Sequence, residues 1–268
     1  MLKKILFLEY KFRDFSDDEL KRPHADGVMA SLGGLNKDRI KQIKDLGFAF
    51  GISFVVFPGG SVCPLSPQAL SFLNRKLKKI ITLKPNVIWF DYLKFQGKWG
   101  VVRRDLSETH RSCKFCEGKD RLLEIVKIAK DAVKLVPRKI KTGYFAMPYE
   151  EGEYGGWEKI LGQDHKRLGF IFDYISPMLY HRMIGKRVSY ISEYVKYLND
   201  LDISAEIIPI IQLKDMPDEL PDKLTLKEIE QEVDEATKSP SAGVAVFSWD
   251  QTIEKGRLDR VSRILRKI

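Results

Sequence analysis

Short runs of apolar residues alternate along the chain with longer segments in which apolar residues recur every three or four positions. The short runs are apolar almost throughout, which is typical of parallel strands that helices cover. We predict strands at residues 3–10, 26–32, 48–57, 86–95, 141–149, 173–181, 204–212 and 242–250.

The longer segments have the spacing of amphipathic helices that pack on a sheet. We predict helices at residues 37–46, 67–82, 119–135, 157–168, 187–200, 225–238 and 254–267. The connection after the first strand is short and polar, so its helix is expected to be weak or missing. Strands that alternate with helices in this number predict an α/β fold, a single (β/α)8 TIM barrel.

The barrel is predicted to occupy residues 1–268 as one domain, with residues 96–118 as a long loop insertion after the fourth strand, at the C-terminal face. An open doubly wound sheet is the alternative. It would need a glycine-rich phosphate loop after an early strand, and the candidate PGGSVCP (58–64) opens no helix of the right pattern.

Composition indicates a globular protein with a charge-rich surface, because 44% of the 268 residues are apolar and 31% are charged. The net charge of +9 fits either an anionic partner or a lysine-rich surface. Basic and acidic residues are interleaved along the helices, which favours the second interpretation and disfavours a nucleic-acid partner. A nucleic-acid surface would use the basic residues of the insertion: Arg103, Arg104, Arg111, Lys114, Lys119 and Arg121.

The N-terminus MLKKILFLEY has lysines and an apolar run, but Glu9 interrupts the run and no small-residue cleavage site follows. No apolar stretch has the length needed to cross a membrane. We therefore expect a cytoplasmic protein without a membrane partner. The sequence predicts no particular oligomeric state.

Polar residues at the ends of the predicted strands should meet at one face of the barrel, where the βα loops of a TIM barrel form the active site. They are Glu9, Lys11, Ser31, Pro58, Gly59, Asp91, Lys94, Tyr149, Glu150, Tyr180, His181, Gln212, Trp249 and Asp250. This set is rich in carboxylates and aromatic rings, a mixture that suits a carbohydrate substrate. The predicted substrate-binding residues are Lys94, Tyr149, Tyr180, His181, Gln212 and Trp249.

Two of these residues have more than one interpretation. His181 is a candidate acid/base or hydroxyl ligand, or a plain polar residue of the rim. Trp249 is a candidate platform for a sugar ring, because Asp250 follows it at the predicted strand exit. Trp89 is expected to pack inside the barrel instead.

Asp91 ends the apolar run VIWF, where a rigid strand delivers a carboxylate into the mouth. Glycoside hydrolysis needs two carboxyl groups, one that attacks or stabilises the anomeric carbon and one that protonates the leaving oxygen. Asp91 is therefore a candidate nucleophile or base, and Lys94 is expected to keep it ionised. The alternative is an Asp91–Lys94 or Asp91–backbone pair that only ties the rim together.

The second carboxylate is less clearly marked. The seventh strand ends in Gln212, and the other acids near strand ends are Glu9, Glu150, Glu151 and Asp250. Glu9 and Asp250 are the preferred catalytic candidates because they end strands. A barrel that had kept the pocket and lost its acid would be a non-catalytic glycan-binding protein.

Three motifs carry a resemblance: FDYLKF at strand four, YISPMLYH at strand six and VFSWD at strand eight. Together they resemble glycoside-hydrolase-type TIM-barrel proteins, whose fourth strand ends in a phrase such as FDYIRF and whose sixth contains SPMxY. The phrase LKPNVIWFD is also similar to the nucleophile strand of alpha-L-fucosidases, although the histidine-rich N-terminal motifs of that family are absent. The resemblance implies hydrolysis of an oligo- or polysaccharide without a catalytic cofactor, with Asp91 as the attacking residue.

A cysteine motif lies in the insertion. HRSCKFCEG contains His110, Cys113 and Cys116, a spacing that can present two thiolates to one zinc ion. Cys63 follows the neighbouring strand, so these four residues form a candidate Cys3His site for a structural zinc. A local redox pair and unbound thiols are the alternatives. Three cysteines, an odd number, do not indicate a disulfide framework.

Overall fold

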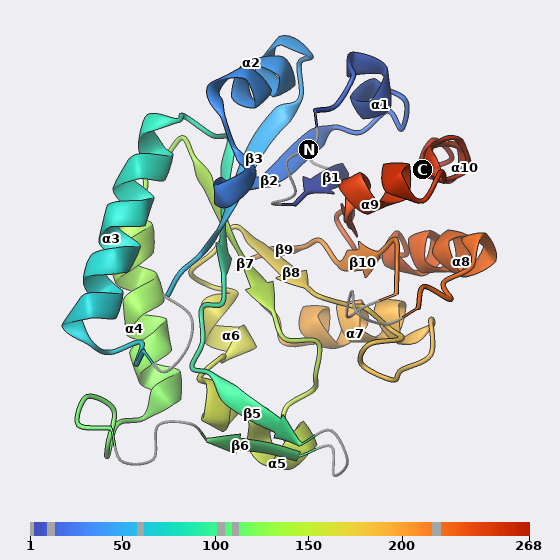
Figure 1. Ribbon diagram of the computed structural model, residues 1–268. Helices are drawn as coiled ribbons and strands as arrows, with labels where there is room; N and C mark the ends of the chain where they lie inside the picture. Colours follow the sequence, from blue (N-terminus) through green and yellow to red (C-terminus); the bar gives the residue numbers. More distant parts are fainter. Residues whose placement is uncertain (1–2, 10–13, 58–61, 101–104, 109–112, 216–220) are drawn as a thin grey trace.

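The apolar runs form one parallel sheet in the computed structural model, which describes residues 3–9, 14–57, 62–100, 105–108, 113–215 and 221–268 (Figure 1). Its strands are β1 (Lys4–Leu8), β2 (Gly27–Ser31), β3 (Ala49–Val55), β4 (Val87–Asp91), β7 (Lys141–Ala146), β8 (Tyr174–Pro177), β9 (Glu206–Ile207), β10 (Ile210–Gln212) and β11 (Val244–Phe247). The strands neighbour one another in the order β10-β11-β1-β2-β3-β4-β7-β8-β9.

The sheet closes on itself because β9 and β10 are the two halves of one interrupted strand. β9 pairs with β8, and β10 pairs with β11. The backbone N–H of Leu179, just after β8, donates to the carbonyl of Ile210 at 2.8 Å. Pro209 lies between the halves and has no N–H to offer the ladder. The predicted (β/α)8 TIM barrel is confirmed, with its seventh strand split in two.

Helices lie between the strands and around the ring (Figure 1). They are α1 (Asp17–Lys21), α2 (Lys37–Asp45), α3 (Pro67–Thr82), α4 (Arg121–Lys134), α5 (Glu153–Leu161), α6 (His165–Leu168), α7 (Tyr190–Asp200), α8 (Leu226–Ala236), α9 (Trp249–Glu254) and α10 (Leu258–Leu265), with a 3-10 turn at Leu32–Gly34. The weak helix expected after the first strand is α1, whose N-terminus is stabilised by a capping box between Ser16 and Glu19.

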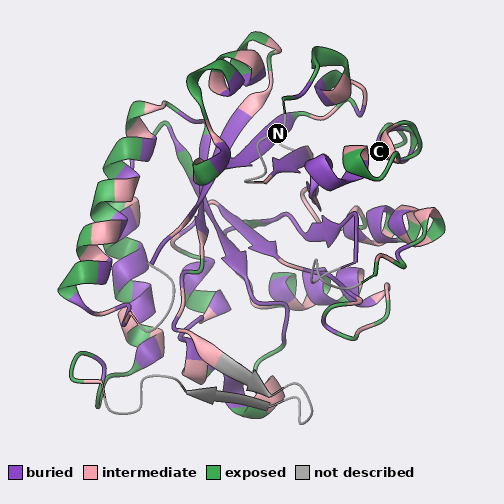
Figure 2. Cartoon of the chain, in the orientation of Figure 1, coloured by how far each residue is buried: buried purple, intermediate pink, exposed green. Residues whose placement is uncertain are grey.

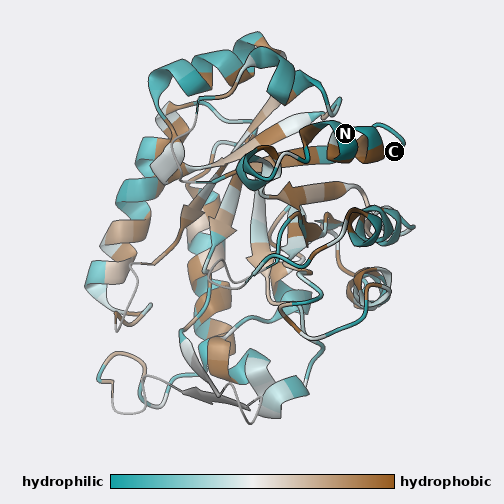
Figure 3. Ribbon diagram, turned by 45° about the vertical axis from the view of Figure 1, so that its right-hand side comes forward, coloured by the Kyte–Doolittle hydropathy of each residue, from teal (hydrophilic) through white to brown (hydrophobic). Residues whose placement is uncertain are grey.

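Burial follows the layers of the barrel. Most residues of the parallel sheet are buried, and exposed residues gather on the outer faces of the helices (Figure 2). Hydrophobic residues follow the same division, since the strands and the inner helix faces are the most apolar parts (Figure 3). None of the helices in the described ranges combines the length and the hydropathy that a membrane span requires.

The insertion after β4 contains an element that the sequence analysis missed. β5 (Gly97–Gly100) and β6 (Asp105–Glu108) form a two-stranded antiparallel hairpin that lies beside α5 (Figure 1). The backbone N–H of Phe95 donates to the carbonyl of Leu161 at 2.7 Å, which ties the start of the insertion to the end of α5. The strand β5 is short and begins and ends with glycine, so its pattern gives little strand signal.

Large side chains fill the inside of the ring. Trp89, on β4, is 1% exposed, as expected for a packing residue. Its ring lies 6.0 Å from the ring of Phe145 and 5.5 Å from that of Tyr174, measured between centroids. Two glycines on the neighbouring strands, Gly51 and Gly143, leave the space that the indole occupies.

We predict that Gly143→Ala destabilises the protein. A Cβ at this position would lie 2.3 Å from Cζ3 of Trp89, inside any allowed contact distance. The buried ring has no room to retreat, so we expect a loss of about 1–3 kcal/mol in the free energy of unfolding, typical of an overpacked core. Urea unfolding at pH 7 measures it.

Gly51→Ala is the matched control, because its Cβ would lie 3.3 Å from Nε1 of Trp89 and needs a smaller adjustment. Adding Trp89→Phe to Gly143→Ala should recover part of the loss, which a double-mutant cycle detects. Equal losses at both glycines, or additive effects in the cycle, would show that the indole does not set the constraint.

Candidate active site

A pocket of about 390 Å³ opens at the carboxyl ends of the strands. Its lining residues come from β1, β2, β4, β7 and β11 and from the segments that follow β1, β4, β7 and β8: Phe7, Glu9, Ser31, Asp91, Tyr92, Lys94, Phe145, Met147, Pro148, Tyr149, Met178, Tyr180, Met183, Ile184 and Phe247. In a TIM barrel this face is where the active site forms. Six residues of the predicted mouth therefore meet in one cavity: Glu9, Ser31, Asp91, Lys94, Tyr149 and Tyr180.

Aromatic rings form much of the pocket wall. The rings of Tyr180 and Phe247 are stacked at 27°, with centroids 5.5 Å apart. Phe247 lies 4.9 Å from Phe7, and Phe7 lies 5.8 Å from Phe145. These rings connect the pocket to the packed interior of the barrel, so the wall is rigid. Of these four aromatic residues, Tyr180 is a predicted substrate-binding residue, and Phe7, Phe145 and Phe247 were not predicted.

Asp91 stands at the end of β4 and is fixed by the tight turn that follows. Its Oδ1 accepts a hydrogen bond from the backbone N–H of Tyr92 at 2.8 Å. Tyr92 has a φ of 55°, in the left-handed region, and its carbonyl accepts from the N–H of Lys94 at 2.8 Å. The Lys94 ammonium lies 4.9 Å from the centroid of the Tyr92 ring. The turn thus places the carboxylate and the ammonium in the same pocket.

The pKa values of Asp91 and Lys94 are both shifted toward pH 7. Burial raises the pKa of Asp91 to about 6, although the Tyr92 N–H and the Lys94 charge both lower it. Burial lowers the pKa of Lys94 to about 8, opposed by the charge of Asp91. We expected Lys94 to keep Asp91 ionised; its charge acts in that direction, but desolvation is the larger effect. Such paired shifts in a cleft are typical of functional sites.

Glu9 lies just after β1 and lines the same pocket as Asp91. The negative charges of both carboxylates act on the phenol of Tyr180, whose pKa is raised well above 10 mainly by burial. Tyr180 therefore keeps its proton and can donate a hydrogen bond at neutral pH. The structure brings two of the three predicted catalytic residues into one cavity.

Asp250, the third predicted catalytic residue, does not line this pocket. It is 1% exposed and lies in the first turn of α9, because the chain turns into a helix at Trp249 instead of continuing the strand. Burial raises the pKa of Asp250, and its Oδ2 accepts the backbone N–H of Glu9 at 2.8 Å. Asp250 is thus a buried support for the backbone of Glu9.

His181 points away from the pocket, although Tyr180 lines it. The chain begins a turn at His181, where the N–H of Ile184 donates to the carbonyl of Tyr180 at 3.0 Å, and the imidazole lies against α8. Its Nδ1 lies 2.5 Å from Oε1 of Glu232 on α8, and both side chains are buried. Burial raises the pKa of Glu232 to about 7, although His181 lowers it. This buried pair joins the turn after β8 to α8.

Gln212 and Trp249, predicted to bind substrate, are also outside the pocket. Gln212 is fully buried, and its Nε2 lies 3.5 Å from Oδ1 of Asp215. Trp249 is 0% exposed, and its Nε1 donates to the carbonyl of Glu19 at 3.0 Å. The expected sugar platform at Trp249 is therefore a core residue that holds α9 against α1.

The three cysteines meet as predicted, away from the pocket. The Sγ atoms of Cys63, Cys113 and Cys116 all lie within 4.8 Å of one another. Burial raises the pKa of Cys63 and of Cys116, whereas a hydrogen bond from the backbone N–H of Phe115 is the main cause that lowers the pKa of Cys113. Several predicted residues lie outside the described part of the chain: Lys11, Pro58, Gly59, Arg103, Arg104, His110 and Arg111.

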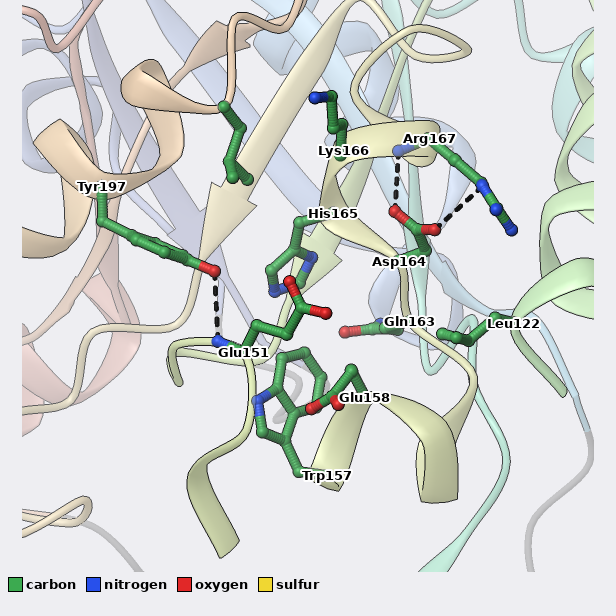
Figure 4. Close-up of a pocket in the computed structure, with 11 residues that line it drawn as sticks. Leu122, Glu151, Trp157, Glu158, Gln163, Asp164, His165, Lys166, Arg167 and Tyr197 are labelled. Carbon is green, nitrogen blue, oxygen red and sulfur yellow. Dashed lines mark hydrogen bonds and ion pairs between the residues drawn. The ribbon is translucent and has the colours of Figure 1, made fainter. Parts of the chain in front are cut away.

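A second cavity, of about 280 Å³, lies among α5, α6 and α7 (Figure 4). Its histidine, His165, is held by the hydroxyl of Tyr144 and the carbonyl of Met147, each at 3.0 Å. Burial lowers the pKa of His165 to about 4, so the ring is neutral. Asp164 is paired with the backbone and side chain of Arg167. His165 and Asp164 are thus occupied by hydrogen bonds and an ion pair within the protein. The strand-end pocket is therefore the better candidate active site.

Comparison with solved structures identifies the fold as a TIM barrel of the kind found in chitinases and related hydrolases. The Bacillus cereus spore cortex-lytic enzyme SleL has a TM-score of 0.64 at 11% identity, over 98% of this chain and 73% of that chain. A chitinase from Bacteroides thetaiotaomicron has a TM-score of 0.64 at 13% identity, over 99% and 96%.

A plant class V chitinase mutant from Cycas revoluta, in complex with (GlcNAc)3, has a TM-score of 0.63 at 10% identity, over 98% of this chain and 99% of that chain. No family model matches the sequence, and no curated protein matches it significantly. At such low identities the likeness establishes a shared fold alone.

We predict that Asp91→Asn is more stable than the wild type, and that this difference in the free energy of unfolding is larger at pH 7 than at pH 4. Burial raises the pKa of Asp91 to about 6 in the folded state, whereas the ordinary pKa of an aspartate carboxyl is 3.8. Between these values the folded state binds more protons than the unfolded state, so the wild-type free energy of unfolding falls as pH rises. Asparagine does not titrate, and its Oδ1 can still accept the Tyr92 N–H.

Urea unfolding of both proteins at pH 4 and pH 7 measures the effect, and the advantage of the variant should be larger at pH 7. Asp234→Asn, an exposed position on α8, is the control and should show no such change. The same advantage of Asp91→Asn at both pH values would mean that burial does not perturb this carboxyl.

Proposed function

We propose that the protein is a glycoside hydrolase that acts on an oligo- or polysaccharide, with Asp91 as nucleophile or base. The observation that supports this most directly is that Asp91 and Glu9 line one aromatic pocket at the carboxyl ends of the strands. Most glycoside hydrolases use two carboxyl groups that flank the glycosidic bond. The hydrolysis that we propose needs no cofactor, and the cysteine cluster takes no part in it.

Asp91 is suited to attack or to activate water because its position is rigid. It is the last residue of β4, and the Tyr92 N–H fixes one of its oxygens, which leaves the other for the reaction. Glu9 is the candidate for the second carboxyl group. Its backbone is held by Asp250, so its side chain starts from a defined point at the rim.

The substrate-binding groups of the proposal are the proton donors of the pocket. Lys94, with its ammonium charge, and Tyr180, with a phenol that stays protonated, can donate to sugar hydroxyls. Tyr149 is a further donor, because burial raises its pKa well above the ordinary value. The stacked rings of Tyr180 and Phe247 offer an apolar surface for the C–H face of a sugar.

N-acetylglucosamine oligosaccharides are the substrates to test first. The Cycas revoluta structures contain (GlcNAc)3 or (GlcNAc)4, and their barrel has the fold of this chain. The pocket also has apolar side chains from Met147, Met178 and Met183, which offer contacts for a methyl group. Sites of this kind combine apolar walls with a few polar groups that set orientation.

A non-catalytic glycan-binding barrel is the second candidate. Within the described part of the chain, Glu9 and Asp91 are the two carboxylates that line the pocket. The whole reaction therefore depends on Glu9 reaching the glycosidic oxygen. If it does not, the same rings and donors would bind a sugar without cleaving it.

We predict that Asp91→Asn and Glu9→Gln each lower kcat/KM by about 10²–10⁴-fold, the usual contribution of a positioned acid or base. The assay is a screen of aryl glycosides that includes aryl N-acetylglucosaminides. Both variants keep the shape of the pocket, so binding of (GlcNAc)3 by calorimetry should persist.

Asp234→Asn on α8 removes an exposed carboxylate and should leave turnover unchanged. Turnover that survives Asp91→Asn would exclude the assigned role of that residue. Sugar binding by the wild type without turnover of any glycoside in the screen would establish the second candidate.

We further predict a bell-shaped dependence of kcat/KM on pH, with limbs at about 6 and about 8. Activity should rise through the lower value as Asp91 loses its proton, and fall through the upper value as Lys94 loses its charge. The kcat/KM profile reports the groups of the free enzyme.

Lys94→Met tests whether the alkaline limb of the pH profile belongs to Lys94. It should remove the alkaline limb and move the acid limb to higher pH, because the Lys94 charge lowers the pKa of Asp91. An alkaline limb that persists in Lys94→Met would assign that limb to another group.

A further inference from the structure

The cysteine cluster joins two connections that are far apart in the sequence. Cys63 precedes α3, and Cys113 and Cys116 lie at the end of the insertion, just before α4. Cys63 and Cys116 are buried and Cys113 is partly exposed, and these three cysteines are not joined by disulfides. The cluster is therefore a point at which the connection before α3 meets the end of the insertion.

The spacing of the sulfur atoms fits ligands of one metal ion. All three Sγ atoms lie within 4.8 Å of one another. Two thiolates on a tetrahedral zinc, each about 2.3 Å from the ion, are about 3.8 Å apart. Disulfide sulfurs are separated by about 2.05 Å and would use only two of the three residues. A redox pair needs only two cysteines, so the meeting of all three sulfur atoms favours a metal site.

Backbone N–H groups point at two of the three sulfur atoms. The N–H of Leu65 donates to the sulfur of Cys63, and the N–H groups of Phe115 and Cys116 donate to the sulfur of Cys113. Hydrogen bonds of this kind favour the anionic form of a ligand. A metal ion binds the thiolate and displaces its proton, so these donors favour the metal-bound state.

Local turns hold the sulfurs in place before any ion binds. The carbonyl of Cys113 accepts the N–H groups of Cys116 and Glu117 at 3.0 and 2.9 Å, which makes a tight C-x-x-C turn. On the other side, the N–H of Ser66 donates to the carbonyl of Cys63 at 3.0 Å, and Ser66 caps α3. Arg121, in the first turn of α4, places a positive charge near Cys116, which offsets the excess charge of three thiolates.

We propose that Cys63, Cys113 and Cys116 supply three of the four ligands of one zinc ion, which links the β3–α3 connection to the end of the insertion. Thiolates select zinc over harder cations. The site is separate from the proposed active site, because the residues that line the strand-end pocket include no cysteine. The ion acts as a structural cross-link and supplies no chemistry to the pocket.

The test is the metal content of the full chain after expression with zinc, purification under reducing conditions and dialysis. Elemental analysis should find one zinc per chain. Cys63→Ser, Cys113→Ser and Cys116→Ser should each weaken retention by more than about 100-fold, beyond the usual cost of losing an outer-shell contact. Glu117→Gln, in the same turn and without a thiol, is the matched control and should retain the ion.

A second measurement uses the wild-type protein, so it remains informative if the cysteine variants do not fold. Zinc is removed from the wild-type protein with a chelator and replaced by Co²⁺, and a thiolate-to-cobalt charge-transfer band in the near ultraviolet is expected. Chelation should also increase proteolytic cleavage within residues 96–118. A wild-type chain that holds only trace zinc and gives no such band, or that contains a disulfide among these cysteines after purification, would overturn the proposal.

Discussion

Filling the inside of a closed ring is the constraint on which the rest of this structure depends. A barrel of eight strands has just enough internal space for side chains, so each large residue must be matched by a small one. Trp89 occupies the space left by Gly51 and Gly143, and Phe145 packs against it. Phe145 is also a wall of the pocket. The packing that closes the barrel therefore sets the shape of the candidate active site.

The same packing explains the electrostatics of Asp91. Its carboxylate projects from a strand whose other residues are buried, next to rings that exclude water. Desolvation shifts the Asp91 pKa upward more strongly than Lys94 and the Tyr92 N–H shift it downward. A carboxylate in this position costs stability at neutral pH, which is a common property of residues retained for chemistry. An exposed rim pair would not show this balance.

The sequence predicted the barrel well because its strands are apolar runs separated by amphipathic helices. It also placed Asp91, Tyr149 and Tyr180 correctly at the mouth, since these residues lie at or just beyond strand ends. It could not resolve which way a side chain turns there: Tyr180 enters the pocket, whereas His181 pairs with Glu232 in the helix layer. The apolar walls, such as Phe7 and Phe247, look like ordinary core residues in the sequence. Tertiary packing alone distinguishes them.

The bond from Glu9 to Asp250 joins residues that are separated by 241 positions. β1, the strand that Glu9 follows, also pairs with β11, which lies more than 200 residues further along the sequence. During synthesis on the ribosome, β1 must therefore wait until β11 has emerged before it acquires its second neighbour. The rim that carries Glu9 is completed only at that moment, so partial chains released early would lack the pocket altogether.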